Sequence, residues 1–192
     1  ATLSWANQGN SFSLTPYFTN FSSYIALLDT GVVQYHDHGG VEEALKVFQH
    51  QNIPAEFYGL EFQGNINLSA NYALSYWGDY VRAKNKNGGD LPRIPPLTLG
   101  SGLSYQWSAL RANIDIEHKF SQSDIGANEL KTDDFTNLSL TMNYELPEAK
   151  GLNIFIKGDN LLDEEKRDHT SFLKDMTLKG ERSFSVGITG SF

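Results

Sequence analysis

The sequence predicts an all-β fold whose antiparallel strands cross a membrane as part of a β-barrel. Three observations predict it: apolar and polar residues alternate with period two, several alternating segments run for about ten residues, and tight turns alternate with long polar loops. Tyr and Trp lie near the ends of these segments, where the interfaces of a bilayer would be. Lipid satisfies no backbone donor or acceptor, so such strands cross it only in a closed sheet.

The segment from residue 110 to residue 120 shows the alternation most clearly. Leu110, Ile114 and Ile116 share one parity, whereas Asp115 and Glu117 lie on the other. Soluble strands are usually shorter than this segment, so its two faces are expected to meet lipid and water. With a partial strand near the start of the chain, about nine strands are expected. The same pattern recurs in residues 12–18, 72–80, 97–105, 138–146, 154–162 and 184–192, and residues 47–68 are also expected to be extended.

One stretch departs from this pattern. Residues 26–46 are too long for a simple hairpin connection and are expected to form an insertion. Within it, the run from Val41 to Lys46 (VEEALK) is expected to form one or two helical turns. The insertion would belong to the long loops on the outer side of the membrane.

Composition excludes several classes of protein. The 192 residues carry a net charge of -8, which argues against nucleic-acid binding because phosphate neutralisation needs clustered Lys and Arg. Cysteine is absent, which excludes disulfides and thiolate metal sites, and no apolar run approaches the length of a spanning helix. No linker divides the chain, so residues 1–192 are expected to form a single unit, and without a signal peptide this unit is either mature or a fragment.

Two other architectures remain open at this point. A soluble β-sandwich or lectin-like binding module also alternates apolar and polar residues. A small complete barrel with an adhesin or structural role would need an even number of strands. The expected odd number, and a polar face too charged to pack inside a very small barrel, favour an incomplete portion of a larger barrel.

Three motifs resemble a known family. Residues 91–96 (LPRIPP), 158–163 (GDNLLD) and 180–192 (GERSF through the terminal Phe) resemble, in order and spacing, the last strands of TonB-dependent outer-membrane receptors. The resemblance covers essentially the whole chain. Residues 167–175 and 55–59 are most similar to zinc-uptake receptors, while siderophore and haem receptors share much of the same scaffold.

The resemblance implies a plugged barrel of about 22 strands in the bacterial outer membrane. Residues 1–192 would be its C-terminal portion, because they contain no candidate plug and no TonB box. The implied function is import of a scarce metal, with zinc favoured over an iron-siderophore or haem chelate. The implied partners are outer-membrane lipid, the plug and N-terminal strands of the same receptor, the TonB complex through that plug, and the barrel-assembly machinery.

The final strand carries a second resemblance. Phe184, Val186 and Ile188 alternate with small polar residues, and the strand ends at Phe192. This arrangement resembles the signal by which the barrel-assembly machinery recognises its clients. These four residues are therefore the expected assembly signal.

Histidines supply the candidate metal ligands. His36, Asp37 and His38 follow one another in a predicted outer loop, and His50 and His169 lie on segments that could converge nearby. Imidazole and carboxylate suit zinc, here as a transported ligand, and no cofactor is required. The plainer interpretation is that these are exposed polar residues, since an H-x-H pair without two further ligands is a weak site.

Other polar residues carry weaker functional hypotheses. Asp115 and Glu117 are candidates for lining a substrate path, although charges on a lumen face are ordinarily paired and hydrated. His118 lies on the apolar parity near the outer end of its strand, where an interfacial position is expected. No Ser-His-Asp order, phosphate-binding Gly loop or metalloprotease helix can be identified, so the chain is not expected to be an enzyme.

Overall fold

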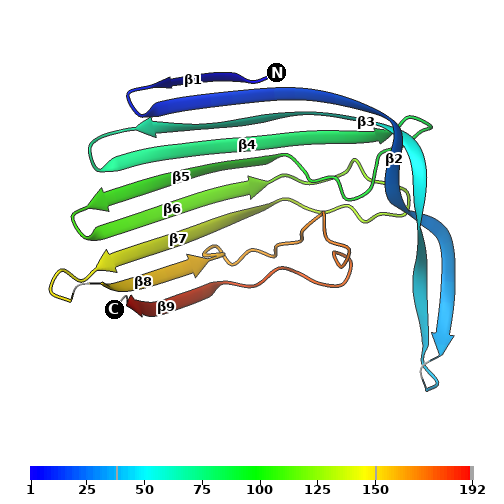
Figure 1. The fold of residues 1–192 in the computed structure, drawn as a ribbon. Coiled ribbons are helices and arrows are strands. Elements are labelled where there is room, and N and C mark those ends of the chain that lie inside the picture. Colours follow the sequence, from blue (N-terminus) through cyan, green and yellow to red (C-terminus); the bar gives the residue numbers. More distant parts are fainter. Residues whose placement is uncertain (38, 150, 191–192) are drawn as a thin grey trace.

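A computed structural model describes residues 1–37, 39–149 and 151–190. These residues form one antiparallel sheet of nine strands, in which each strand pairs with its neighbours in sequence (Figure 1). No helix among them is long and apolar enough to cross a membrane. The strands are β1 (Leu3–Asn7), β2 (Asn10–Asp37), β3 (Glu42–Asn67), β4 (Tyr72–Asn85), β5 (Thr98–Trp107), β6 (Leu110–Lys119), β7 (Phe135–Glu145), β8 (Leu152–Asp159) and β9 (Ser183–Gly190).

One face of the sheet is apolar and uncovered. Ile114 on β6 lies opposite Leu103 on β5 and Leu140 on β7, so branched side chains form a continuous row across three strands. Ile114 is 48 % exposed and Ile116 47 % exposed, because no second layer from the described part of the chain packs on this face. A sandwich would bury these residues against another sheet. The predicted antiparallel β-sheet is confirmed, and among the described residues no second sheet buries this face as a sandwich would require.

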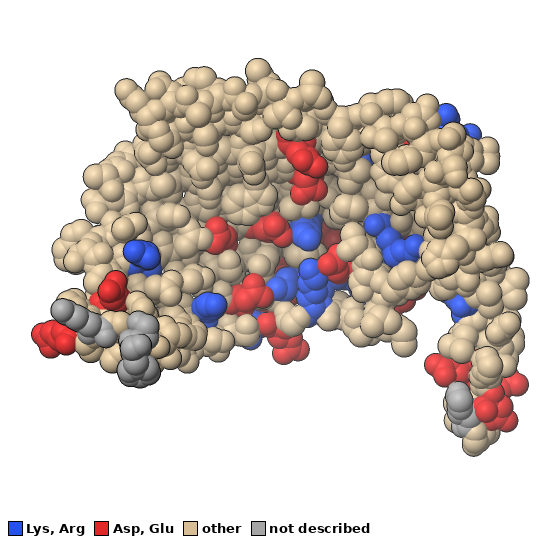
Figure 2. Space-filling model, viewed as in Figure 1, with Lys and Arg blue, Asp and Glu red and all other residues tan. Residues whose placement is uncertain are grey.

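The opposite face carries the charges. Glu61 on β3 lies directly opposite Asp79 on β4, and Glu117 shares this face with Lys119 on β6. Figure 2 shows acidic and basic side chains gathered over the middle of the sheet, surrounded by uncharged residues. In a barrel this face lines the lumen, where water and other polar groups solvate the charges.

Short and long connections lie at opposite ends of the sheet. Residues 8–9, 68–71 and 108–109 make short turns, as do the described residues between β7 and β8, and Gln8 and Ser108 adopt positive φ angles of 48° and 51° there. At the other end, residues 86–97, 120–134 and 160–182 form the β4–β5, β6–β7 and β8–β9 loops (Figure 1). This arrangement confirms the predicted alternation.

The region expected to be an insertion is instead part of a long hairpin. β2 has 28 residues and β3 has 26, and their pairing continues to Asp37 opposite Glu42. The predicted helical turns in residues 41–46 are therefore wrong, because cross-strand pairing overrides the helix propensity of this short run. The pairing register shifts between Phe21 and Tyr24 and again between Asp29 and Val33. These shifts interrupt the alternation of side chains between the two faces, so the sequence shows no continuous period-two pattern over β2.

The hairpin extends far beyond the remaining strands. At about 3.3 Å per residue β2 would measure roughly 90 Å, several times the height of the apolar band of a barrel. In Figure 1 the two strands leave the sheet, turn, and run across the end that carries the long loops. The register shifts supply this turn, since extra residues bend a strand.

A small apolar core lies where the hairpin leaves the sheet. Ala55 on β3 and Ala83 on β4 are fully buried there beneath Leu91 of the β4–β5 loop. Ala55 has the same parity as Glu61, so the face that is charged in the middle of the sheet becomes apolar at this end. The loop folds over that face and excludes water from it. Further members of the core are Ala26, Ile53, Phe21, Tyr24, Leu28, Phe57 and Ile94.

The sheet of described residues is open. β1 and β9 lie at its two edges, and the structure pairs β1 only with β2 and β9 only with β8 within this part of the chain. Open edges expose unpaired backbone groups, which hydrocarbon does not tolerate. The small complete barrel considered above is therefore not the architecture seen here.

Candidate functional site

A buried carboxylate joins the three long loops. Glu129 of the β6–β7 loop accepts hydrogen bonds from the backbone N–H of Arg93, at 2.7 Å, and of Gly126, at 2.8 Å. Lys174 of the β8–β9 loop donates to the same carboxylate, and His169 Nε2 lies 3.4 Å from it. The Glu129 side chain is only 6 % exposed. We call Arg93, Glu129, His169 and Lys174 the loop lock.

Hydrogen bonds keep the Glu129 carboxylate of the loop lock ionised. Burial raises the pKa of the Glu129 carboxyl, but donors from His169, Lys174 and the backbone of Gly126 and Arg93 outweigh burial and lower that pKa to about 2. His169 is 2 % exposed, and its Nδ1 lies 3.0 Å from the hydroxyl of Thr132. Glu129 is therefore an ionised carboxylate at neutral pH, and the loops that supply its donors are held together.

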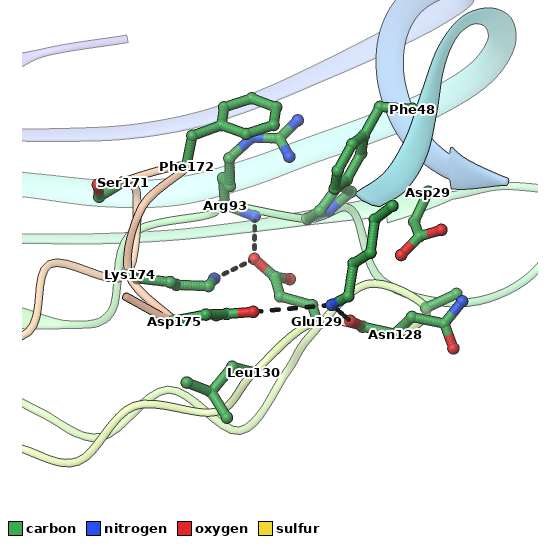
Figure 3. A pocket seen from close by; sticks show the side chains of 13 residues that line it. Asp29, Phe48, Arg93, Asn128, Glu129, Leu130, Ser171, Phe172, Lys174 and Asp175 are labelled. Atoms are coloured by element: carbon green, nitrogen blue, oxygen red, sulfur yellow. Dashed lines mark hydrogen bonds and ion pairs between the residues drawn. The ribbon is translucent and has the colours of Figure 1, made fainter. Parts of the chain in front are cut away.

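A second set of contacts ties the hairpin to this cluster (Figure 3). The Arg93 guanidinium donates to the Leu27 carbonyl at 2.9 Å and lies 4.3 Å from the centre of the Phe172 ring. That ring meets Phe48 of β3 edge-on, with centroids 5.3 Å apart. Lys46 Nζ lies 3.6 Å from Asp175 Oδ2. The side chains of Lys46, Phe48, Arg93, Phe172 and Asp175 line a recess of about 50 Å³, which is too small for a chelate.

The GDNLLD motif explains how the β8–β9 loop begins. Asn160 has a positive φ of 53° and is fully buried. Its side-chain amide donates to the carbonyls of Glu164, at 2.9 Å, and Gly180, at 3.3 Å, so it fastens the start of the loop to its end. Next to it, buried Lys166 donates to Asp159 and Asn137, each at 3.0 Å. The motif is thus a local scaffold for the loop that carries His169 and Lys174.

The histidines predicted as metal ligands lie in different environments. His36 and Asp37 are exposed near the tip of the hairpin, opposite Glu43 and Glu42, and His38 lies outside the described residues. His50 is exposed on β3, whereas His169 is buried in the loop lock. Within the described ranges no three His, Cys, Asp or Glu residues form a group suited to a metal ion. Metal capture by these residues stays a prediction.

The predicted lumen residues are where the alternation put them. Asp115 accepts a hydrogen bond from Asn113 on its own strand, and Glu117 lies 3.9 Å from Lys119. Both are half-buried on the charged face. His118 lies on the opposite face, with Nδ1 3.0 Å from the Thr136 hydroxyl and its ring edge-on to Phe120. A role of Asp115 and Glu117 in a substrate path stays a prediction.

The residues of the predicted assembly signal lie on an edge strand. Phe184, Val186 and Ile188 are exposed and face Gly158, Ile156 and Ile154 of β8. Phe192 lies outside the described residues. The described part of the signal is therefore an apolar row on an open edge, and its recognition stays a prediction.

Sequence patterns did not reveal the loop lock. Arg93, Glu129 and Lys174 come from three loops far apart in the chain, and no spacing relates them. Two signals were available: Arg93 belongs to the LPRIPP motif, and His169 and Lys174 lie in the segment 167–175 that resembles zinc-uptake receptors. Their roles in the lock became visible only once the three loops were placed side by side.

Comparison with known proteins identifies the family. Residues 1–161 match the family model described as "TonB dependent receptor-like, beta-barrel". The chain belongs to the TonB-dependent receptor β-barrel family. The nine-stranded sheet corresponds to the C-terminal third of these receptor barrels, which confirms the predicted fold. The family places the chain in the bacterial outer membrane and is one of transporters rather than enzymes, as predicted.

Solved TonB-dependent receptor structures share the fold at low sequence identity. The chain is 20 % identical to the copper transporter OprC, with a TM-score of 0.77. The match covers 100 % of this chain and 30 % of the OprC chain. A mutant of the ferric enterobactin receptor PfeA from Pseudomonas aeruginosa gives 20 % identity, a TM-score of 0.73 and the same coverage. The siderophore receptor PirA from Acinetobacter baumannii gives 17 % identity, a TM-score of 0.71, and coverage of 98 % and 30 %. The chain thus spans about a third of the length of these receptors.

Proposed function

We propose that the chain forms the C-terminal wall of a receptor that imports a scarce metal, as an ion or a chelate, across the outer membrane. The observation that carries the proposal is the division of the sheet into an uncovered apolar face and a charged face, in a chain of the TonB-dependent receptor family. The similar structures include a copper transporter and receptors for ferric enterobactin and other siderophores, which supports a metal cargo.

Transport would need parts of the receptor that lie outside residues 1–192. The remaining strands would close the barrel at the open edges of β1 and β9, and a plug would fill its lumen. The TonB complex would act through that plug, and the barrel-assembly machinery would insert the barrel. In this arrangement the loop lock holds the outer loops above the lumen, and the charged face lines the path below them.

Uptake measurements test the proposal. A strain lacking the full receptor gene is supplied with limiting zinc, copper or ferric enterobactin, and accumulation of each is compared with the parent strain and with a strain lacking TonB. We expect accumulation of one cargo to fall in both mutants, because an active receptor loses either its pore or its energy source. Unchanged accumulation of all three would remove metal import from consideration.

Zinc is the specific cargo that we propose to test first. Its support is the sequence His36-Asp37-His38, of which His36 and Asp37 are exposed near the hairpin tip, together with the resemblance to zinc-uptake receptors. Asp37, Glu42 and Glu43 lie at the same tip, and their charge would raise the local concentration of a cation. The names of the similar structures reported above instead indicate copper or ferric siderophores as cargo classes.

A histidine substitution separates zinc capture from the other cargoes. In the full receptor, His36→Ala combined with His38→Ala should weaken zinc binding by about tenfold or more, since each imidazole ligand lost removes a strong zinc bond. Gln34→Ala is the matched control, because it changes a nearby exposed side chain of the same strand and keeps both imidazoles. Equal zinc affinity of the double variant and the control, measured by calorimetry, would exclude the tip as a zinc site.

A further inference from the structure

The far end of the β2–β3 hairpin stands apart from the rest of the described chain. We define the distal ribbon as Val32–Asp37 of β2 and Glu42–Lys46 of β3, which pair with each other from Val33 opposite Lys46 to Asp37 opposite Glu42. Every residue of this ribbon is exposed. Figure 1 shows it projecting past the ends of the other strands. An isolated two-stranded hairpin is marginally stable in water, so the ribbon requires a surface to pack on.

The ribbon carries an apolar surface of its own. Tyr35, which is 68 % exposed, lies on one face with Val33 and Ala44, and Leu45 lies on the other face. Val32 and Val41 extend this apolar surface toward the two ends of the ribbon. A β-ribbon that displays aliphatic and aromatic side chains on a projecting arm has the composition of an interface core.

Both backbone edges of the ribbon are also free within the described residues. β1 pairs with β2 only as far as Leu14, and β4 pairs with β3 only as far as Ala55. Unpaired strand edges bind further extended segments through backbone hydrogen bonds. The ribbon therefore offers both apolar side chains and backbone donors and acceptors.

The negative charge at the tip of the distal ribbon indicates which kind of partner surface would bind it. Asp37, Glu42 and Glu43 gather at the tip, seen in Figure 2 as the acidic group at the end of the arm. Lys46 at the base is engaged with Asp175 of the β8–β9 loop. A partner surface that is basic and partly apolar would complement this arrangement.

We propose that the distal ribbon docks on a basic, partly apolar outer loop contributed by the part of the same receptor that lies outside residues 1–192. The similar receptors are about three times longer than this chain, so other barrel loops surround the mouth that the arm crosses. The base of the arm is fixed by Phe48 against Phe172 and by Lys46 against Asp175, which aims the ribbon in one direction. The proposal rests on membership of a larger receptor barrel. It is an alternative to zinc capture at the tip, because a basic loop docked there would cover and neutralise Asp37, Glu42 and Glu43, and it is compatible with any other cargo.

Photo-crosslinking in the full receptor tests this docking. Tyr35→p-benzoylphenylalanine is introduced in cells, the outer membranes are irradiated, and the adduct is mapped by mass spectrometry. We expect an adduct between position 35 and a loop of the same polypeptide outside residues 1–192, with the mobility of a monomer. An adduct with a second copy, with another protein or only with residues 1–192 would overturn the proposal, and so would the absence of an adduct.

Two matched controls make the result specific. The same photo-crosslinker at Trp107, which is exposed at the short-turn end of β5, should not reach the loop captured from position 35. Glu42→Lys combined with Glu43→Lys should lower the adduct yield several-fold, because it reverses the charge of the tip. Asp133→Lys combined with Asp134→Lys, on the exposed β6–β7 loop, should leave that yield unchanged. An unaffected yield in the tip variant would overturn the charge-complementary docking.

Failure of the docking can be distinguished from failure of the proposed metal import. Receptor folding is confirmed for each variant by its heat-modifiable migration, and metal accumulation is measured on the same strains. Normal accumulation without the expected adduct overturns the docking alone. The expected adduct without any metal accumulation overturns the cargo and leaves the docking intact.

Discussion

At the scale of single residues, Glu129 connects parts of the chain that no strand pairing joins. Its carboxylate receives donors from the β4–β5 and β8–β9 loops as well as from its own loop. Removing one partner of a buried, hydrogen-bonded charge cluster costs about 3–5 kcal/mol, because the remaining charge is left without compensation. A single side-chain change in the loop lock is therefore expected to disturb three outer loops at once.

Glu129→Gln should loosen the three loops while the barrel strands stay folded. The amide keeps the shape of the side chain and loses the charge that faces Lys174 and His169. Hydrogen exchange of residues 120–134 and 160–182 should accelerate, with a local destabilisation of about 2–4 kcal/mol. Glu165→Gln makes the same chemical change at an exposed position of the β8–β9 loop and should have no effect. Equal exchange in the two variants would show that the lock is not what orders the loops.

Acid should weaken the same cluster over a defined range of pH. The pKa of Glu129 is lowered from 4.5 to about 2, so its contribution to stability is present above the unfolded value and is lost as pH falls through the folded value. The corresponding free energy is roughly 3 kcal/mol. Loop protection measured by hydrogen exchange should fall between about pH 5 and pH 2. A Glu129→Gln receptor should lack this component, and identical pH profiles would contradict the assignment.

At the scale of elements, β6 has one face suited to lipid and one face suited to water. Ile114 and Ile116 point to the uncovered apolar face, and Asn113, Asp115 and Glu117 point to the charged face. Asn113 contacts both Ser104 and Asp115, so the polar side chains on this face satisfy one another locally. Adjacent positions on the strand should therefore respond in opposite ways to the same substitution.

Ile114→Arg and Asn113→Arg form a matched pair of variants. Arginine at Ile114 would face hydrocarbon and should destabilise the full receptor by about 2–4 kcal/mol if the site lies near the bilayer midplane. Arginine at Asn113 would lie beside Asp115 in a hydrated lumen and should cost less than about 1 kcal/mol. Urea unfolding in lipid vesicles measures both values. Equal costs would show that the assignment of the two faces is incorrect.

At the scale of the whole molecule, the sheet depends on strands beyond its edges. β1 and β9 are the edges of the described sheet, and the chain spans about 30 % of the length of the similar receptors. In hydrocarbon each unpaired backbone group costs several kcal/mol, so an open sheet does not persist there. Closure is thus a property of the complete receptor.

Residues 1–192 expressed alone should fail to form a heat-resistant, membrane-embedded barrel. Co-expression with the remaining part of the receptor should restore migration as a folded barrel and retention in outer membranes after a carbonate wash, because the edges of β1 and β9 would then be paired. Retention and heat-modifiable migration of residues 1–192 alone would contradict the requirement for further strands. A full-length receptor serves as the positive control.

The sequence by itself determined the strands that alternate without interruption. From Leu110 to Lys119 and from Phe135 to Glu145, period two assigns each side chain to one face, and the lumen position of Asp115 followed from parity alone. The resemblance to TonB-dependent receptors came from residues 91–96, 158–163 and 180–192, and the family model that matches residues 1–161 confirms the family. Local patterns suffice here because strand geometry itself fixes which face a residue occupies.

Only the tertiary structure decided the hairpin and the loop lock. The register shifts near Tyr24 and Val33 break the alternation, so the sequence alone suggested an insertion where two strands pair to the tip. His169 carries no sequence signal of burial, and it becomes buried because Glu129, Thr132 and Lys174 surround it from two loops. Contacts between distant loops depend on how the chain brings them together, and no local periodicity encodes that placement.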